Sequence, residues 1–164
     1  MTELMHAVKA DDLDAVRACL AQGADVNQAD AAGDWPVIFA AYLGHTRILQ
    51  VLLEAGADLT VLDPGMKATA LHAAAYAGHA EACRLLIAHG ISLNQQGPSN
   101  GYTALHDAVW QSNLEAAAVI VEAGADLTIR SRSHQTPLDL ARSSRTAQAD
   151  KLVALLESRE IPGP

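Results

Sequence analysis

The chain has 164 residues, half of them hydrophobic, and a formal net charge of −8 at pH 7. This length suits one domain rather than two, and the acidic balance argues against binding to the phosphate backbone of nucleic acids. No apolar run approaches the roughly 18 residues of a membrane-spanning helix, so we expect no membrane association. Aromatic residues make up only 4% of the chain. The interior must therefore be built from small and aliphatic side chains, which suits closely packed helices.

The sequence repeats itself at a nearly constant interval. Four similar segments carry a glycine at evenly spaced positions: AQGADVN at Gly23, EAGADLT at Gly56, AHGISLN at Gly90 and EAGADLT at Gly124. A second set of similar segments begins at positions 35, 69, 103 and 136, with the same spacing: WPVIFAAYLGH, TALHAAAYAGH, TALHDAVWQSN and TPLDLARSSRT. Two independent landmarks that share one period indicate a repeat architecture.

Each unit of the repeat predicts a short helix, a turn and a second helix. A hydroxyl that can cap the first helix opens three of the units, at Thr69, Thr103 and Thr136. Gly44 and Gly78 then allow a sharp turn, because glycine adopts positive φ without a steric penalty. The second helices carry aliphatic residues at helical spacing and end at the glycines given above. One such unit cannot bury its apolar face alone, so the units must stack.

These segments resemble the ankyrin repeat family, whose pattern runs T-P-L-H, A-A, G-H, L-L and G-A-D in that order, and the resemblance covers nearly the whole chain. It implies an all-α fold, a solenoid of helix–turn–helix units with β-hairpin finger loops. It further implies a single ankyrin repeat domain, residues 1–164, with five repeats at about 1–32, 33–66, 67–100, 101–134 and 135–164. The first and last of these would act as caps. Members of the family usually bind partners through the fingers and the concave face made by the first helices.

Two repeats depart from the family pattern. In the second repeat, Trp35 and Ile38 replace the threonine and histidine of T-P-L-H. Losing both polar groups together leaves fewer unpaired atoms than losing one of them. The third and fourth repeats keep the pair, and we expect their histidines to be structural: Thr69 with His72, and Thr103 with His106. In the fourth repeat, Ser112 takes the glycine position of the turn, where a positive φ costs on the order of 1 kcal/mol.

Aromatic residues recur at one position near the end of the first helix. Tyr42, Tyr76 and Trp110 take this position in the three middle repeats, whereas Lys9 and Ser143 take it in the first and last. Equivalent positions of a solenoid line up on one face, so we expect a column of rings on the concave side.

Two interpretations of this column remain open. The rings could seal one repeat against the next, or they could contact a partner, and the enrichment of Tyr and Trp at protein interfaces favours the second. Trp35 and Tyr102 lie at the base of the fingers on the adjoining edge, so we expect them to join the column in partner binding. Phe39 is expected in the core.

Acidic residues accompany the column. Asp34 and Asp107, together with Asp30 and Asp63, lie in or near the fingers and the first helices. Each alone suits a turn or a helix cap. Together they predict a partner protein with a basic or apolar patch. We therefore expect Asp34 and Asp107 to contribute to partner binding.

The chain carries no pattern that indicates catalysis. It has no nucleophile elbow, phosphate-binding glycine loop or metal-ligand spacing, and the repeat pattern already accounts for His72, His106 and Asp107. Its two cysteines, Cys19 and Cys83, are expected to be buried, reduced thiols. We expect no enzyme activity, no metal and no cofactor.

The sequence thus predicts a non-catalytic protein-binding module that is cytoplasmic and monomeric in isolation. Ankyrin-like bacterial proteins include dedicated inhibitors and immunity proteins, so the resemblance extends to the hypothesis of an inhibitor or immunity protein for a bacterial effector. The alternative is a structural or assembly subunit that uses the same face for self-association or for scaffolding a complex.

Overall fold

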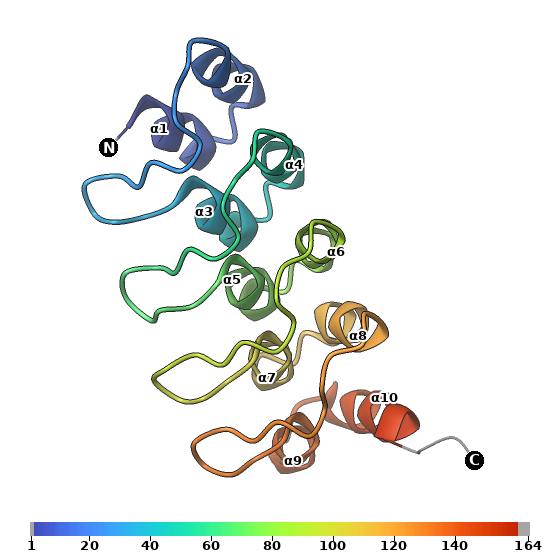
Figure 1. Cartoon of the computed structure of the whole chain (residues 1–164). Helices are drawn as coiled ribbons and strands as arrows, with labels where there is room; N and C mark the ends of the chain where they lie inside the picture. The colour runs from blue at the N-terminus through green and yellow to red at the C-terminus, as the bar shows by residue number, and fades with distance from the viewer. Residues whose placement is uncertain (1, 161–164) are drawn as a thin grey trace.

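The computed structural model describes residues 2–160, and over that range the chain forms ten α-helices in five consecutive pairs (Figure 1). The first helices of the pairs lie in one row beside the loops: α1 (Glu3–Lys9), α3 (Pro36–Leu43), α5 (Ala70–Ala77), α7 (Ala104–Trp110) and α9 (Pro137–Ser143). The second helices form the other row: α2 (Leu13–Ala21), α4 (Thr46–Glu54), α6 (Ala80–Ala88), α8 (Leu114–Glu122) and α10 (Ala149–Glu160). The predicted all-α stack of helix pairs is confirmed. The predicted repeat boundaries fall in the long loops between pairs.

The first helices begin where the sequence places a capping hydroxyl. Thr69 accepts a hydrogen bond from the backbone N–H of His72, whose ring in turn accepts from the Thr69 backbone N–H. The same reciprocal arrangement opens α7 and α9. Helix α3 has no side-chain cap at Trp35 and begins instead with Pro36, whose fixed φ suits the first helical position.

Small residues let the first helices approach one another closely. The alanines that face neighbouring pairs are fully buried: Ala40, Ala41, Ala74, Ala75 and Ala108. The second helices fill the space behind them with branched side chains, among them Ile48, Leu49, Leu52, Leu86 and Ile120. The core is therefore one continuous cluster that runs through all the pairs, and each pair is stabilised by its neighbours.

The turn between paired helices needs left-handed backbone, and the next repeat explains why glycine is used there. Gly44 and Gly78 have φ of 72° and 83°. A Cβ at Gly44 would collide with the imidazole of His79, and one at Gly78 would collide with the side chain of Asn113. Ser112 occupies the equivalent position with φ of 59°, as predicted.

The fingers are turns rather than β-hairpins. Each is closed by one backbone hydrogen bond across its base: Asp30 to Asp34, Asp63 to Ala68, Gly97 to Tyr102 and Ser131 to Gln135. No residue between 2 and 160 is in a β-strand, so the strand content expected of the fingers is not found. The chain reverses directly after the closing bond, which leaves no room for a ladder.

Candidate partner-binding face

The predicted aromatic column is exposed. Tyr42, Tyr76 and Trp110 lie in the last turns of α3, α5 and α7 and are 48%, 45% and 62% exposed. With Met66 they make up the exposed large hydrophobic side chains of residues 2–160. No ring contact joins Tyr42 to Tyr76 or Tyr76 to Trp110 in this range. The rings therefore do not seal the repeats by stacking on one another.

A groove of about 440 Å³ runs between the fingers and the helices α3, α5 and α7, and we call it the finger groove. Its apolar wall consists of Ile38, Phe39, Tyr42, Met66, Ala73 and Tyr76. Three carboxyl groups border it: Asp34, Asp63 and Asp107. The groove brings together five of the predicted binding residues: Asp34, Trp35, Tyr42, Tyr76 and Asp107. Tyr102 and Trp110 do not line it and lie beside it on the fourth repeat, which also carries Asp107.

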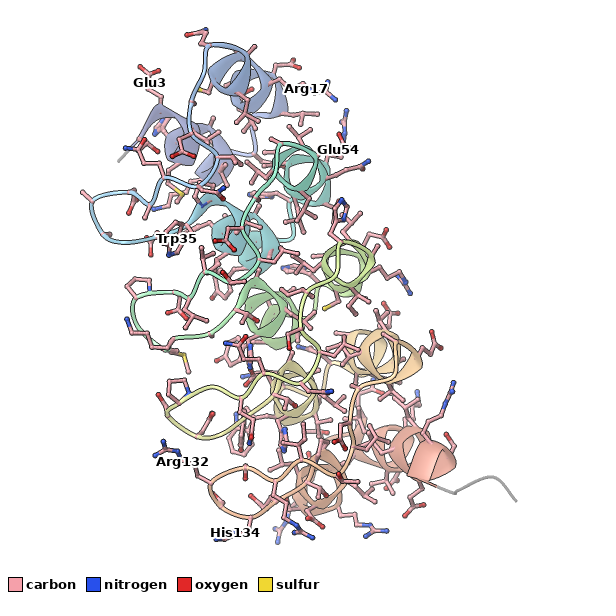
Figure 2. All side chains as sticks on the ribbon, viewed as in Figure 1. Glu3, Arg17, Trp35, Glu54, Arg132 and His134 are labelled. Carbon is pink, nitrogen blue, oxygen red and sulfur yellow. The ribbon has the colours of Figure 1, made fainter. Side chains whose placement is uncertain are left out.

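Trp35 lies where the first finger meets α3 (Figure 2) and is half-buried. Its indole N–H donates a hydrogen bond of 3.1 Å to the carbonyl of Leu62 in the next finger. In the following repeats a histidine bridges neighbours in a similar way, as the ring of His72 bonds to the Tyr102 carbonyl at 3.0 Å. Trp35 thus supplies a bond between repeats that Ile38 cannot make. Its ring also lines the groove.

The histidines of the T-P-L-H motif are structural, as expected from the sequence. His72 and His106 are buried, and the Nδ1 atom of each accepts from the backbone N–H of the capping threonine. The opposite nitrogen, Nε2, must then carry the proton and donate to a carbonyl of the next repeat. Burial lowers the pKa of both imidazoles, so both rings are neutral near pH 7.

Trp110 has one aromatic neighbour among residues 2–160. The ring of Tyr102 lies 6.4 Å from that of Trp110, tilted by 60°, and is stacked on His106 at 5.2 Å. Tyr102 is half-buried, and its pKa is raised by burial and by the nearby charge of Asp107. Tyr102 therefore supports Trp110 from one side and leaves most of the indole open to solvent.

The first repeat places a cation at the column position. The Lys9 ammonium lies 3.5 Å from Asp30 and 3.6 Å from Asp34, and it sits 4.2 Å from the centre of the Phe39 ring. Asp34 is thus paired within the chain. The prediction that Phe39 is a core residue is wrong: it is half-buried and forms part of the groove wall, where it holds Lys9.

The other two carboxyl groups of the groove differ in their partners. Asp63 accepts hydrogen bonds from the backbone N–H groups of Gly65, Met66 and Ala68 and so fixes the shape of its finger. Asp107 forms no side-chain hydrogen bond and no ion pair within residues 2–160. Burial raises the pKa of its carboxyl group to about 7. Asp107 is therefore the unpaired acid of the finger groove.

The family model described as "Ankyrin repeats (3 copies)" matches residues 1–63 and 58–131. The chain belongs to the ankyrin repeat family. Ankyrin repeats generally mediate protein–protein interactions and are typically non-catalytic. A search of curated proteins gives no significant match.

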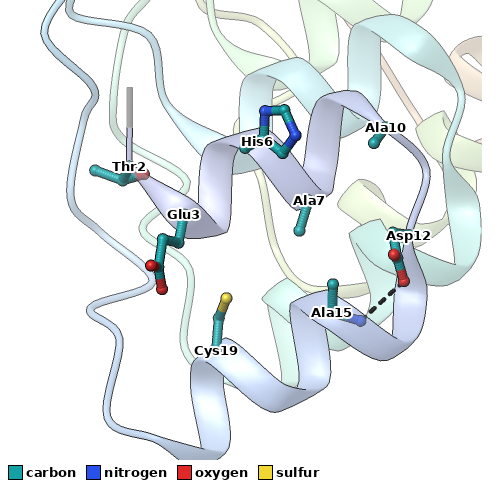
Figure 3. Close-up of a pocket in the computed structure, with 8 residues that line it drawn as sticks. All are labelled: Thr2, Glu3, His6, Ala7, Ala10, Asp12, Ala15 and Cys19. Atoms are coloured by element: carbon teal, nitrogen blue, oxygen red, sulfur yellow. Dashed lines mark hydrogen bonds between the residues drawn. The ribbon is translucent and has the colours of Figure 1, made fainter.

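A second hollow of this ankyrin repeat chain, about 450 Å³, lies between α1 and α2 (Figure 3). Small side chains line it, with Glu3, His6 and Cys19 at its rim, and no hydrogen bond joins these three in the described chain. Cys19 is half-buried rather than buried as predicted. Cys83 is buried as expected, and burial raises the pKa of its thiol to about 12.

Residues 2–160 contain no group of three His, Cys, Asp or Glu side chains arranged to hold a metal ion. Over the same range, every helix is too short or too polar to cross a lipid bilayer.

Proposed function

We propose that this ankyrin repeat chain binds a partner protein through the finger groove and the adjoining Trp110, without catalysing a reaction. The observation that carries the proposal is the gathering of exposed Tyr42, Met66 and Tyr76 in the finger groove, with the exposed Trp110 at the equivalent position of the next first helix, α7. Large apolar side chains in solvent lose the stabilisation that burial provides, and rings are the anchors that dominate protein interfaces. A partner that covers this face recovers that burial.

The charge of the face favours a partner of opposite sign. The chain carries −8, and Asp63 and Asp107 border the groove without an ion pair to any cation within residues 2–160. A basic patch on the partner would be steered towards such a surface. In an isologous dimer the same patch meets its own copy, which would bring these carboxylates towards one another. The charges therefore support binding of a different protein over self-association. In this proposal the chain by itself is a cytoplasmic monomer.

A more specific form of this function is the masking of an effector. If the partner uses a basic surface to act on another molecule, the finger groove would inhibit it by covering that surface. This chain would then act as an inhibitor or immunity protein. The test is a titration of the captured partner's activity with this chain, in which inhibition is complete at one equivalent. Undiminished activity in the saturated complex would limit the function to binding.

The binding proposal is tested by quantitative affinity capture with three proteins: wild type, Tyr76→Ala/Trp110→Ala, and the control Arg47→Ala/Gln50→Ala. The control residues are exposed on α4, in the row of second helices. We expect the aromatic double variant to lose the partner and the control to keep it, with equal helical circular dichroism for all three. Equal capture by all three would overturn the proposal. Sedimentation that shows a dimer dependent on Tyr76 and Trp110 would favour the assembly role instead.

A further inference from the structure

The column position of the first repeat shows what the inner face of this chain can bind. Lys9 points its ammonium at two finger carboxylates, Asp30 and Asp34, and at the face of the Phe39 ring. An aromatic ring and carboxylates around one ammonium combine cation–π attraction with ion pairing. Asp34 and Phe39 also border the finger groove, so this bound cation lies at the end of the groove.

The next repeats provide the same kind of surroundings but no cation. At the column position the second and third repeats carry Tyr42 and Tyr76 in place of lysine. The carboxyl groups beside these rings in the groove are Asp63, in the finger of the second repeat, and Asp107, on α7 of the fourth repeat. No ion pair within residues 2–160 reaches either of these two acids. The rings and the negative charge are therefore both present, whereas no residue between 2 and 160 supplies a positive charge to them.

The lack of a positive charge beside Asp107 costs the protein stability. The Asp107 side chain is partly buried in the finger groove, and no hydrogen bond or ion pair within residues 2–160 satisfies its carboxyl group. A charged carboxylate in such a place lowers stability unless a counter-charge is supplied. Ionisable groups that are kept in unfavourable surroundings are a mark of binding sites. A cation from a partner would relieve the cost.

The walls of the groove suit a long side chain that ends in a cation. Met66, Tyr42, Tyr76 and Ala73 offer apolar surface along which a methylene stem can lie. The volume of about 440 Å³ exceeds what a small ion needs, and the described residues contain no metal-binding cluster. A neutral apolar side chain would fill the groove but would leave Asp107 unpaired.

We propose that the finger groove takes a lysine or arginine side chain from a basic segment of the partner, with its stem against Tyr42 and Tyr76 and its head group directed to Asp107 and Asp63. This inference rests on the proposed function and specifies the chemistry of the partner. Apolar residues on either side of the inserted lysine or arginine pack on Met66 and on the exposed indole of Trp110.

The probe is a phage-displayed library of random dodecapeptides, selected at pH 8 on the full chain. We expect the selected peptides to share one lysine or arginine flanked by apolar residues. Calorimetry then measures the Kd of a selected peptide, with both ends blocked, for wild type, Asp107→Asn and Glu122→Gln. Glu122 is exposed on α8, so Glu122→Gln changes the net charge equally but lies in the other row of helices.

Loss of a desolvated charge pair weakens binding substantially, so Asp107→Asn should raise Kd by about tenfold or more. Replacing the basic residue of the peptide by norleucine should raise Kd similarly, whereas Glu122→Gln should change it less than about twofold. Peptides that need Tyr76 but carry no basic residue, or that bind Asp107→Asn as tightly as wild type, would overturn this inference and leave the proposed function standing. A selection without any peptide that depends on Tyr76 would overturn both.

Discussion

Asp107→Asn should make the protein more stable, by an amount that grows with pH. The Asp107 carboxyl group lies in the first turn of α7, and burial raises its pKa from 3.8 to about 7. The folded protein therefore holds this proton more tightly than the unfolded chain does. The stability that the proton contributes is fully present below about pH 4 and is lost as pH rises through about 7. Asparagine keeps the shape of the side chain without the buried charge.

The size of the effect follows from the pKa difference. A change from 3.8 to about 7 corresponds to about 4 kcal/mol at pH values above both. Because the side chain keeps partial contact with solvent, water screens part of this cost, and we expect about 1–2 kcal/mol.

The assay is urea unfolding of wild type, Asp107→Asn and the control Glu122→Gln between pH 4 and 8.5. The difference in free energy of unfolding between Asp107→Asn and wild type should be close to zero at pH 4 and reach its plateau above about pH 7.5. His72 and His106 titrate in both proteins, so their contribution cancels in this difference. A difference that does not vary with pH, or a variant less stable than wild type at pH 8, would show that the buried Asp107 carboxylate does not destabilise the fold.

Four substitutions test the turns and the packing between repeats by thermal and urea unfolding. Gly44→Ala should destabilise by about 2–3 kcal/mol, because it adds a collision with the next repeat to the strain of positive φ. Gly56→Ala has open space around its Cβ and should cost only about 1 kcal/mol; equal losses would contradict the collision. Trp35→Phe should cost about 1 kcal/mol through the lost bond to Leu62, and unchanged stability would show that bond to be unimportant. Ser112→Gly should stabilise slightly, since relief of strain outweighs an exposed hydroxyl bond; a lower melting temperature would contradict this.

The fold could be predicted because its determinants are local and recur in register. The capping threonine and the histidine that follows it meet within one turn, so Thr69 and His72 can be paired from their spacing. The left-handed turn at Ser112 follows from its alignment with Gly44 and Gly78. Each helix pair packs against the pairs that precede and follow it in the sequence. The repeat interval of the sequence therefore specifies the whole stack.

The exposure of the aromatic column could also be predicted from the sequence. The contacts around these rings could be predicted only in part. Phe39 stands at the same distance from the cap position of its helix as Asp107 does, and this equivalence places it on the inner face rather than in the core. The partners of Lys9 come from the finger that follows α2, and repeat spacing does not determine a contact so distant along the chain. The indole bond of Trp35 depends on how far a large ring reaches into the next finger. These contacts required the structure.

Whether a partner covers the finger groove is tested most directly by amide chemical shifts of the labelled chain, recorded free and saturated with its captured partner. We expect the largest changes on α3, α5 and α7 and on the fingers at 30–34 and 63–68, with the indole N–H of Trp110 among them. Changes centred on α4, α6 and α8, with an unaltered Trp110 signal, would contradict it.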